Sequence, residues 1–301
     1  MSSRRYEYLS PEQVEQFLHE GWVVLRGAIA PQTVQEWTQH IFTRLGFDEK
    51  DPATWERPIT HMPFHGRVPA AEVSPHAWGA MCELLGGEDR VHSCTWGDSF
   101  IVNLGSEADT ETWQPPSPQS GGWHKDGDFF RHFLDSPEQG LLTIVLWSDV
   151  LPRGGATFIA KDSVAPVARY LAAHPEGVGP GEFHFGSLIN ECHHFAEATG
   201  EAGDVYLMHP YMLHASSKNA LRRPRFITNP PASLKEPMQF NRSNPDDFSL
   251  VELAILRSLG VDRLDFQPTR PRERITPGSA TRKQQMLEDE KARLAAAGVA
   301  A

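Results

Sequence analysis

The sequence predicts a sandwich or barrel of β-strands flanked by helices, and three features of the chain lead to this fold class. Short β-rich runs begin near residue 96, and clusters of Gly, Pro and Ser separate them. Apolar residues recur at helical spacing before residue 96 and again after residue 252. The 301 residues are 40% hydrophobic and 22% charged, a globular composition, and this length fits one large domain over residues 1–301.

The N-terminal part, residues 1–95, is expected to be a helical layer with one buried strand. Ser10 and Pro11 supply an N-cap and a first-turn proline, and Gly21 ends this helix. The run Trp22–Gly27 (WVVLRG) is typical of a buried strand. Two more helices are expected, one opened by Pro31 and one running from Ser74-Pro75 to Gly86-Gly87.

Residues 96–230 are expected to form the β core, with a partly helical insert over residues 161–203 and a C-terminal helical extension over residues 231–301. A polar loop rich in Pro, Ser and Gly, Glu107–Gly122, ends directly before Trp123, and long loops of this kind are often lids or binding loops. The predicted core strands are Ser99–Gly105, Leu141–Val150, Ala156–Ala160, Asp204–His209 and Arg225–Asn229.

Charge and cysteine content narrow the class of protein. The net charge of −11 disfavours nucleic acid and anionic lipid as partners, because both are polyanions. The chain has an odd number of cysteines, three, and no Cys-x-x-Cys pair, which favours a reducing compartment. No signal peptide and no apolar run of 18 residues is seen. We therefore expect a cytoplasmic protein that acts on a small molecule.

The segment Gly121–Phe130 (GGWHKDGDFF) carries the clearest chemical signal. His124 and Asp126 are two positions apart, so a strand would project both side chains to one face, with Lys125 on the other. One imidazole and one carboxylate, completed by a distant histidine, form the set that commonly holds non-haem Fe(II) and leaves positions open. A lone His-x-Asp pair also arises by chance, and here the preceding Gly-Gly turn and the following aromatic residues strengthen it.

The segment Gly203–Asn229 offers two candidates for the third ligand, His209 and His214. Arg225 follows His214 by eleven positions and opens the next β-like run. Two antiparallel strands joined by a hairpin would place His214 and Arg225 in one cavity, where a guanidinium can bind a carboxylate through two hydrogen bonds. This pairing suits a dicarboxylate whose keto-acid end chelates iron and whose far end meets Arg225.

These segments together resemble the phytanoyl-CoA dioxygenase family of Fe(II)/2-oxoglutarate oxygenases. The family's His-x-Asp motif, its distal histidine and its arginine eleven residues later are matched in order and spacing. The resemblance covers most of the chain and is carried by Leu9–Ile29, Trp123–Asp126, Gly154–Ser163 and Gly203–Arg225.

The resemblance implies a mainly β fold with a double-stranded β-helix, or jelly-roll, core on which the N-terminal and C-terminal helices pack. It implies iron bound by His124, Asp126 and His214, and 2-oxoglutarate held by Arg225. The implied reaction uses O2 to hydroxylate an unactivated C–H bond of a small molecule, with release of succinate and CO2. Positions that assist or line the co-substrate pocket in this family map to Ser216, Asn103 and Thr143.

Two features leave the reaction and the substrate partly open. Asp126 favours hydroxylation or desaturation, because halogenating relatives carry a small residue at this position. The loop 107–122 and the run Lys125–Gln139 differ from the family pattern, so its acyl-CoA substrate is not carried over, and the sequence assigns neither prime substrate nor oligomeric state. The alternative function is a metal-binding jelly roll that does not oxidise, such as a cupin-like isomerase, hydrolase or sensor, which would need no clamp at Arg225.

Several residues near the motifs fit two interpretations. Trp123, Phe129 and Phe130 suit either the wall of a substrate pocket or the hydrophobic core. Lys125 is expected to be solvated or ion-paired. His61 and His65 are not expected to bind a second metal, because Pro63 breaks the helix that their spacing would require.

Overall fold

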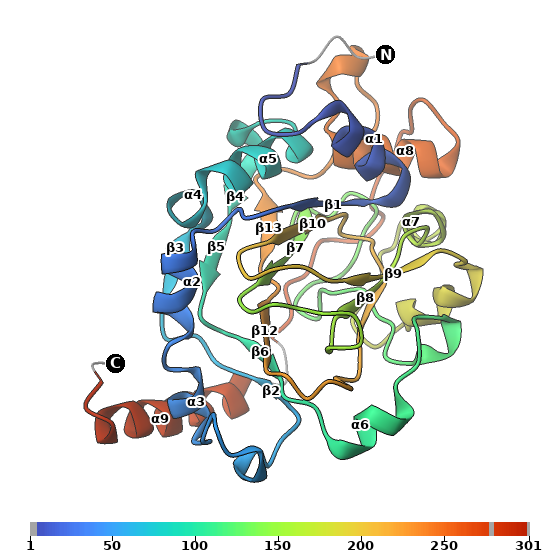
Figure 1. Ribbon diagram of the computed structural model, residues 1–301. Helices are drawn as coiled ribbons and strands as arrows, with labels where there is room; N and C mark the ends of the chain where they lie inside the picture. Colours follow the sequence, from blue (N-terminus) through green and yellow to red (C-terminus); the bar gives the residue numbers. More distant parts are fainter. Residues whose placement is uncertain (1–4, 277–279, 300–301) are drawn as a thin grey trace.

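The computed structural model describes residues 5–276 and 280–299, and shows two main β-sheets and a separate two-stranded sheet, β3-β5, surrounded by helices (Figure 1). Residues 1–4, 277–279 and 300–301, which belong to the expected single domain, lie outside the described residues. The helices are α1 (Pro11–Glu20), α2 (Pro31–Thr38), α3 (Ile41–Leu45), α4 (Ala70–Val73), α5 (Pro75–Leu85), α6 (Glu107–Thr112), α7 (Val164–Ala173), α8 (Leu250–Leu259) and α9 (Ala280–Ala296). The strands are β1 (Trp22–Leu25), β2 (Ile59–His61), β3 (Arg67–Pro69), β4 (Val91–Ser93), β5 (Thr95–Gly97), β6 (Ile101–Asn103), β7 (Leu141–Leu146), β8 (Thr157–Ala160), β9 (Phe195–Ala198), β10 (Val205–Met208), β11 (His214–Ser216), β12 (Arg225–Thr228) and β13 (Pro231–Leu234).

The chain alternates between two antiparallel sheets, which is the connectivity of a jelly roll. The larger sheet has the order β1-β10-β7-β12-β6-β2, and the smaller sheet has the order β11-β8-β9. The segment at His124 joins β11 through an isolated bridge and so adds a fourth row to the smaller sheet. Between β6 and β12 the chain therefore crosses repeatedly from one sheet to the other. Strands β6, β7, β10 and β12 belong to the larger sheet, and the His124 segment, β8, β9 and β11 belong to the smaller sheet. The predicted jelly-roll core with flanking helices is confirmed, and the two sheets do not close into a barrel.

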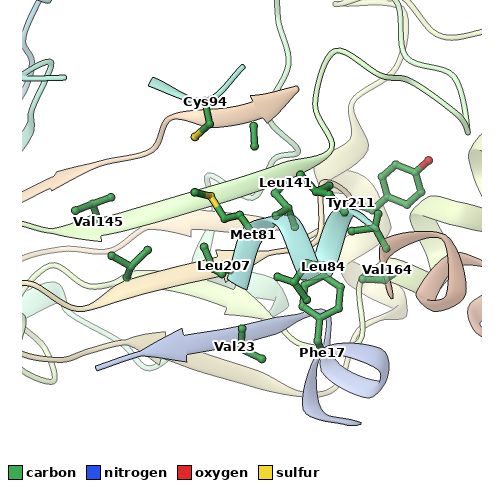
Figure 2. Packing of buried hydrophobic residues seen from close by; sticks show 14 of the residues in the cluster. Phe17, Val23, Met81, Leu84, Cys94, Leu141, Val145, Val164, Leu207 and Tyr211 are labelled. Carbon is green, nitrogen blue, oxygen red and sulfur yellow. The ribbon is translucent and has the colours of Figure 1, made fainter. Parts of the chain in front are cut away.

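Strand β7 shows how the interior is separated from the helical layer. All six residues of β7 are buried, which accounts for its continuous apolar run. Leu142 and Ile144 belong to a cluster between the sheets that also contains Ile159 of the smaller sheet. Leu141 and Val145 point the other way, into the larger cluster beneath the helices (Figure 2). One face of β7 therefore lines the interior of the jelly roll and the other supports the helices.

The N-terminal helix forms where the sequence predicts it. Ser10 and Gln13 form a reciprocal capping box, and Gly21 ends α1 in the left-handed conformation at φ 71°. A side chain at this position would also meet Val164 and Met212. Strand β1 then pairs with β10, so the expected helical layer also supplies strands to the larger sheet.

Three predicted elements differ from the structure. The helix opened by Pro31 is split into α2 and α3, because His40 leaves helical geometry at φ −111° and ψ 9°. The C-terminal extension is not continuously helical: α8 ends at Gly260, and the segment to residue 276 is irregular and contains Pro268 and Pro271. The loop before Trp123 carries the short helix α6.

Candidate metal centre

His124 and His214 lie directly opposite one another on two adjacent backbone segments. The amide of His124 donates to the carbonyl of His214 at 3.0 Å, and the amide of His214 donates to the carbonyl of His124 at 3.0 Å. Their rings are 4.3 Å apart, measured between centroids. One pair of backbone hydrogen bonds thus joins two histidines that are ninety positions apart in the sequence. This pair fixes both imidazoles before any metal binds.

The side chains of His124, Asp126 and His214 converge on one point. The Nε2 atoms of His124 and His214 lie 3.4 Å and 3.5 Å from the Asp126 Oδ1 atom. The three candidate ligand atoms all lie within 4.8 Å of one another. In the part of the chain that the structure describes, no other group of three His, Cys, Asp or Glu residues gathers in this way. His214 is therefore placed with the His-x-Asp pair, and His209 is not.

Backbone carbonyls set the tautomer of both histidines. Nδ1 of His124 lies 2.8 Å from the carbonyl of Gly122, and Nδ1 of His214 lies 3.1 Å from the carbonyl of Met212. A carbonyl only accepts hydrogen bonds, so both Nδ1 atoms carry the proton. The Nε2 lone pairs are then free and face Asp126, which is the arrangement that metal-binding histidines use.

Asp126 remains ionised in this setting. Burial opposes its charge, but His214 and His124 in their protonated forms outweigh burial and hold its pKa below the ordinary value, and a cation bound between the three side chains would act in the same direction. Its second oxygen accepts a hydrogen bond from Asn229 Nδ2 at 3.1 Å. The sequence analysis did not single out Asn229, although strand alternation from Arg225 through Ile227 places it on the same face. Asn229 therefore orients the carboxylate.

The donor set fits a divalent first-row metal. Two ligands about 2.1 Å from one ion lie about 3.0 to 3.4 Å apart for right-angle to tetrahedral geometry. The observed separations of 3.4 Å and 3.5 Å are close to that range, so small side-chain shifts bring all three atoms onto one ion. Two imidazole nitrogens and one carboxylate oxygen leave further positions open, which suits a metal that also binds a substrate or co-substrate.

Arg225 points into the interior between the two sheets, which His214 also faces, and has no acidic partner among the described residues. It shares the inward face of β12 with Ile227, which belongs to the cluster between the two sheets. Its Nε donates to Gly155 O at 2.8 Å and its Nη1 to Ile101 O at 3.2 Å, whereas Nη2 bonds to no described residue. Burial lowers the pKa of Arg225 to about 10. A buried cation without an acidic partner would be stabilised by a bound anion.

The route by which His214 and Arg225 meet differs from the predicted hairpin. β11 pairs with β8 in the smaller sheet, whereas β12 pairs with β6 and β7 in the larger sheet. The two side chains therefore face one another across the interior from opposite sheets. The alternation of a jelly roll moves the chain from one sheet to the other between consecutive strands, and the sequence pattern alone did not reveal this.

Three further residues that the family resemblance maps to the co-substrate pocket, Ser216, Asn103 and Thr143, lie in different surroundings. Ser216 shares the face of β11 with His214, as the two-residue spacing requires. Asn103 lies opposite Arg225 in the β6–β12 pair, but its amide already bonds to Ser217 O and to the amide of Gly105. Thr143 lies on the outward face of β7, opposite Leu207, and donates to Pro230 O. This placement corrects the expectation for Thr143, because it points away from the chamber.

Lys125 is enclosed in aromatic side chains rather than solvated. Its Nζ lies 2.9 Å from His132 Nδ1 and within 6 Å of the ring centres of Phe130, Phe185 and Tyr211, at 5.5, 5.8 and 5.9 Å. Burial lowers the pKa of Lys125 to about 7. Lys125 and His132 line a cavity of about 170 Å³ that also reaches His124. The structure thus corrects the expectation of a solvated or ion-paired lysine, because these aromatic rings pack around Lys125.

The remaining candidate residues belong to the protein interior. His209 is fully buried, accepts from the amide of Tyr211 at 3.1 Å and lies 3.3 Å from Val251 O, and burial lowers its pKa to about 3. Trp123 packs on Phe158 and Phe195 in the core beneath the helices. His65 contacts Glu290 and is not part of the metal-ligand group.

Comparisons with known proteins give similarity at the level of solved structures. No family model matches the chain, and no curated protein sequence matches it. The chain is similar to the structure of the non-heme alpha ketoglutarate dependent carbocyclase SnoK from nogalamycin biosynthesis, with 16% identity, TM-score 0.46, and 76% of this chain and 86% of that chain covered. It is also similar to HygX from Streptomyces hygroscopicus with nickel, 2-oxoglutarate and hygromycin B bound, with 14% identity, TM-score 0.44, and coverage of 75% and 88%.

A third similar structure is EctD from S. alaskensis in its apoform, with 17% identity, TM-score 0.42, and 87% of this chain and 85% of that chain covered. Because each of these TM-scores is below 0.5, the proposal below rests on the geometry of this chain's own residues. Within the described residues, no helix has both the length and the apolar character needed to cross a membrane.

Proposed function

We propose that this protein is an Fe(II)- and 2-oxoglutarate-dependent oxygenase, similar to the phytanoyl-CoA dioxygenase family, that hydroxylates a C–H bond of a small molecule. One observation carries the proposal: the interior between the two sheets, which His214 of the ligand group faces, is also faced by Arg225, a buried guanidinium without an acidic partner among the described residues. A metal site that needs no dicarboxylate has no use for such an arginine. The geometry therefore favours the oxygenase over a non-oxidising jelly roll.

Each residue has a defined task in this proposal. His124, Asp126 and His214 hold Fe(II), which supplies the activation of O2 and the oxidative decarboxylation of 2-oxoglutarate when it is bound. Arg225 binds the far carboxylate of 2-oxoglutarate, and Ser216, on the face of His214, is proposed to assist. Asn229 keeps Asp126 oriented toward the metal. Asn103 holds the turn at Ser217 and thereby shapes the wall beside Arg225.

The carboxylate at position 126 supports hydroxylation rather than halogenation, because it fills the metal position that a halide would need. The three cysteines, Cys82, Cys94 and Cys192, are free and buried, which supports the cytoplasmic location as part of the same proposal. We propose a small-molecule substrate and no nucleic-acid partner.

The test is anaerobic titration of the metal-free protein with Fe(II) and then with 2-oxoglutarate. Chelation of iron by the keto acid is expected to give a weak visible absorption band near about 500 nm, and calorimetry is expected to show one 2-oxoglutarate per chain. A protein that retains zinc, gives no band and binds no 2-oxoglutarate would instead be a non-oxidising metal protein. Succinate release in a metabolite screen would then identify the prime substrate.

A further inference from the structure

A basic pocket lies between β2 and α9. Its volume is about 480 Å³, which is in the usual range for sites that hold small organic molecules. Its apolar part comes from Ile59 and Met286. Its charged and polar lining consists of Arg57, Thr60, His61, Asp128, Arg282 and Lys283, and we call this cavity the basic pocket.

Strand register places the β2 side of the basic pocket on the same face of the larger sheet as Arg225. Ile59 pairs with Asn103 of β6, and Asn103 in turn pairs with Arg225 of β12, so these residues share the inward face of the larger sheet. The ring of His61 lies in the electrostatic field of both Asp126 and Arg225 as well as Lys283 and Arg282.

Asp128 connects the basic pocket to the metal ligands. It follows Asp126 by two residues and lines both the basic pocket and the smaller cavity that contains His124. A molecule in the basic pocket is therefore next to the metal ligands.

The charge of the basic pocket is opposite to that of the whole chain. Arg57, Arg282 and Lys283 form no ion pair with any carboxylate that the structure describes, and Asp128 is the only acid in the lining. The chain as a whole carries a net charge of −11, so a local excess of cations is not a general property of its surface. Unpaired cations around a concave wall raise the local concentration of anions.

The other basic side chains of α9 have protein partners, which sets Arg282 and Lys283 apart. Lys291 pairs with Glu288 at 3.3 Å on the same helix. Arg293 donates to the carbonyl of Arg44 at 2.7 Å, which ties the end of α9 to α3. The two cations at the beginning of α9 are thus free to bind a ligand, whereas those at its end hold the helix.

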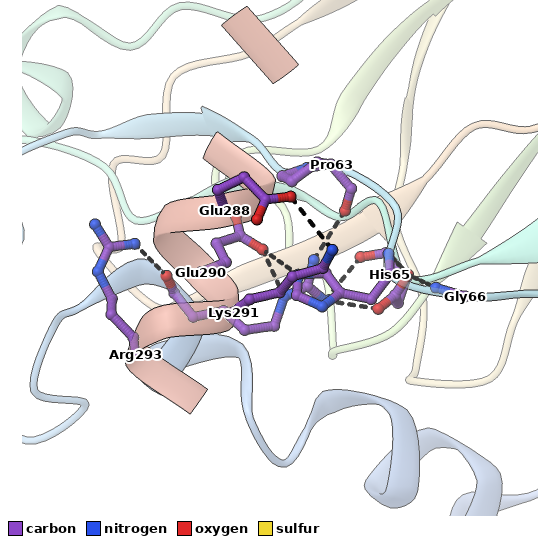
Figure 3. A network of polar contacts seen from close by, with 9 residues as sticks. Pro63, His65, Gly66, Glu288, Glu290, Lys291 and Arg293 are labelled. Atoms are coloured by element: carbon purple, nitrogen blue, oxygen red, sulfur yellow. Dashed lines mark hydrogen bonds and ion pairs between the residues drawn. The ribbon is translucent and has the colours of Figure 1, made fainter. Parts of the chain in front are cut away.

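A buried ionic network ties α9 to α3 and to His65 (Figure 3). The carboxylate of Glu290 is 3% exposed, accepts from Arg44 Nε at 2.8 Å and lies 2.9 Å from His65 Nε2. Arg44 also donates to Asp98 and to Pro63 O. Because Glu290 is two helical turns from Arg282 and Lys283, this anchor also positions the two cations at the rim of the basic pocket.

We propose that the basic pocket binds an oxyanion group, a carboxylate or a phosphate, on the prime substrate, and that Arg282 and Lys283 select for that group. The identification of the occupant as the substrate of the iron centre rests on the proposed function. 2-Oxoglutarate is bound deeper, at Arg225, so the two anions use different cations. The substrate is then an organic acid or a phosphate ester whose reactive C–H bond lies a short distance from its charged end.

The test compares three probes of equal chain length, hexanoate, hexyl phosphate and hexanol, at constant ionic strength. Each is titrated calorimetrically into the anaerobic Fe(II) protein saturated with 2-oxoglutarate, and binding near the metal is also followed by the change in the visible band. The wild-type protein is expected to bind one of the anionic probes at least about tenfold more tightly than hexanol. The stronger of the two anions distinguishes a carboxylate from a phosphate substrate.

The double variant Arg282→Gln/Lys283→Gln is expected to lose this preference and to keep the wild-type affinity for Fe(II) and 2-oxoglutarate. Lys291→Gln removes a charge from the same helix outside the basic pocket and is the matched control, expected to bind all three probes like wild type. Equal affinity of the wild type for the three probes, or a preference that survives in the double variant, would overturn the proposal.

The same titrations on the metal-free protein separate the two proposals. An anion preference that depends on Arg282 and Lys283, in a protein that binds neither Fe(II) nor 2-oxoglutarate, supports the pocket and rejects the oxygenase. Normal binding of Fe(II) and 2-oxoglutarate without any anion preference rejects the pocket alone.

Discussion

His124 and His214 face each other through a reciprocal pair of backbone hydrogen bonds, each 3.0 Å long. This bridge continues the smaller sheet and brings the His-x-Asp segment beside β11. Both imidazoles are also held by a carbonyl two residues earlier in the chain. The metal site is therefore prepared by the backbone, and the side chains need only small adjustments to bind an ion.

Replacing Asp126 with Ala is expected to abolish metal binding and turnover while the protein stays folded. The two histidines alone supply neutral nitrogen ligands, and the charge that attracts a divalent cation is lost. Metal content by elemental analysis and thermal unfolding of the metal-free protein are the measurements. Asp262→Ala, on the exposed surface, is the control. Stoichiometric iron in the Asp126→Ala protein would show that the carboxylate is not a ligand.

Replacing Asn229 with Ala is expected to weaken metal binding by about 10- to 100-fold, because partners that orient a ligand have effects of this size. In the wild-type protein Asp126 Oδ2 accepts a hydrogen bond from Asn229 Nδ2 at 3.1 Å, and the substitution removes this bond. The dissociation constant for Fe(II), measured by anaerobic titration, reports the effect. Asn190→Ala, on the exposed surface, is the control, and an unchanged constant in Asn229→Ala would assign the hydrogen bond to packing alone.

Replacing Arg225 with Ala is expected to raise the dissociation constant for 2-oxoglutarate by roughly 30- to 4,000-fold, since loss of a buried charged partner costs about 2–5 kcal/mol. Iron binding should persist, because Arg225 touches no metal ligand. Arg225→Lys keeps the charge but not the fork of donors, so an intermediate constant is expected. The exposed Arg223→Ala protein is the control. Wild-type affinity in Arg225→Ala would place the dicarboxylate site elsewhere.

His209 is expected to make the metal-free protein less stable in acid. Burial lowers its pKa to about 3, whereas the unfolded chain has the ordinary value of about 6.5. Between these values the unfolded chain binds a proton that the folded protein does not bind. The free energy of unfolding therefore falls as the pH drops below about 6.5, by up to about 1.4 kcal/mol per pH unit, and the change stops near pH 3.

Urea unfolding at pH 6.5 and pH 5 measures this dependence. Replacing His209 with Asn should reduce the loss of stability between these pH values by about 2 kcal/mol, whatever it does to stability at neutral pH. His19→Asn, at an exposed position, should leave the dependence unchanged. Equal pH dependence in the His209→Asn and wild-type proteins would show that this histidine takes up its proton without unfolding.

Local patterns in the sequence were sufficient for much of the fold and for the spacing of His124 and Asp126. Ser10, Pro11 and Gly21 set the bounds of α1 through capping and the left-handed conformation, which depend on neighbouring residues only. The spacing of His124 and Asp126 and the apolar run of β7 likewise follow from periodicity. These features are local, so the sequence alone determined them.

Only the tertiary structure decided which residues share a chamber and which do not. It placed His214 and Arg225 on opposite sheets, turned Thr143 outward, enclosed Lys125 in aromatic rings, and brought Asn229 to Asp126. It also brought Arg282 and Lys283 of α9 into one pocket with His61 and Asp128. The physical reason is that these contacts join segments far apart in the chain, and their geometry depends on how the two sheets and the C-terminal helix pack. No spacing within a single segment records that packing.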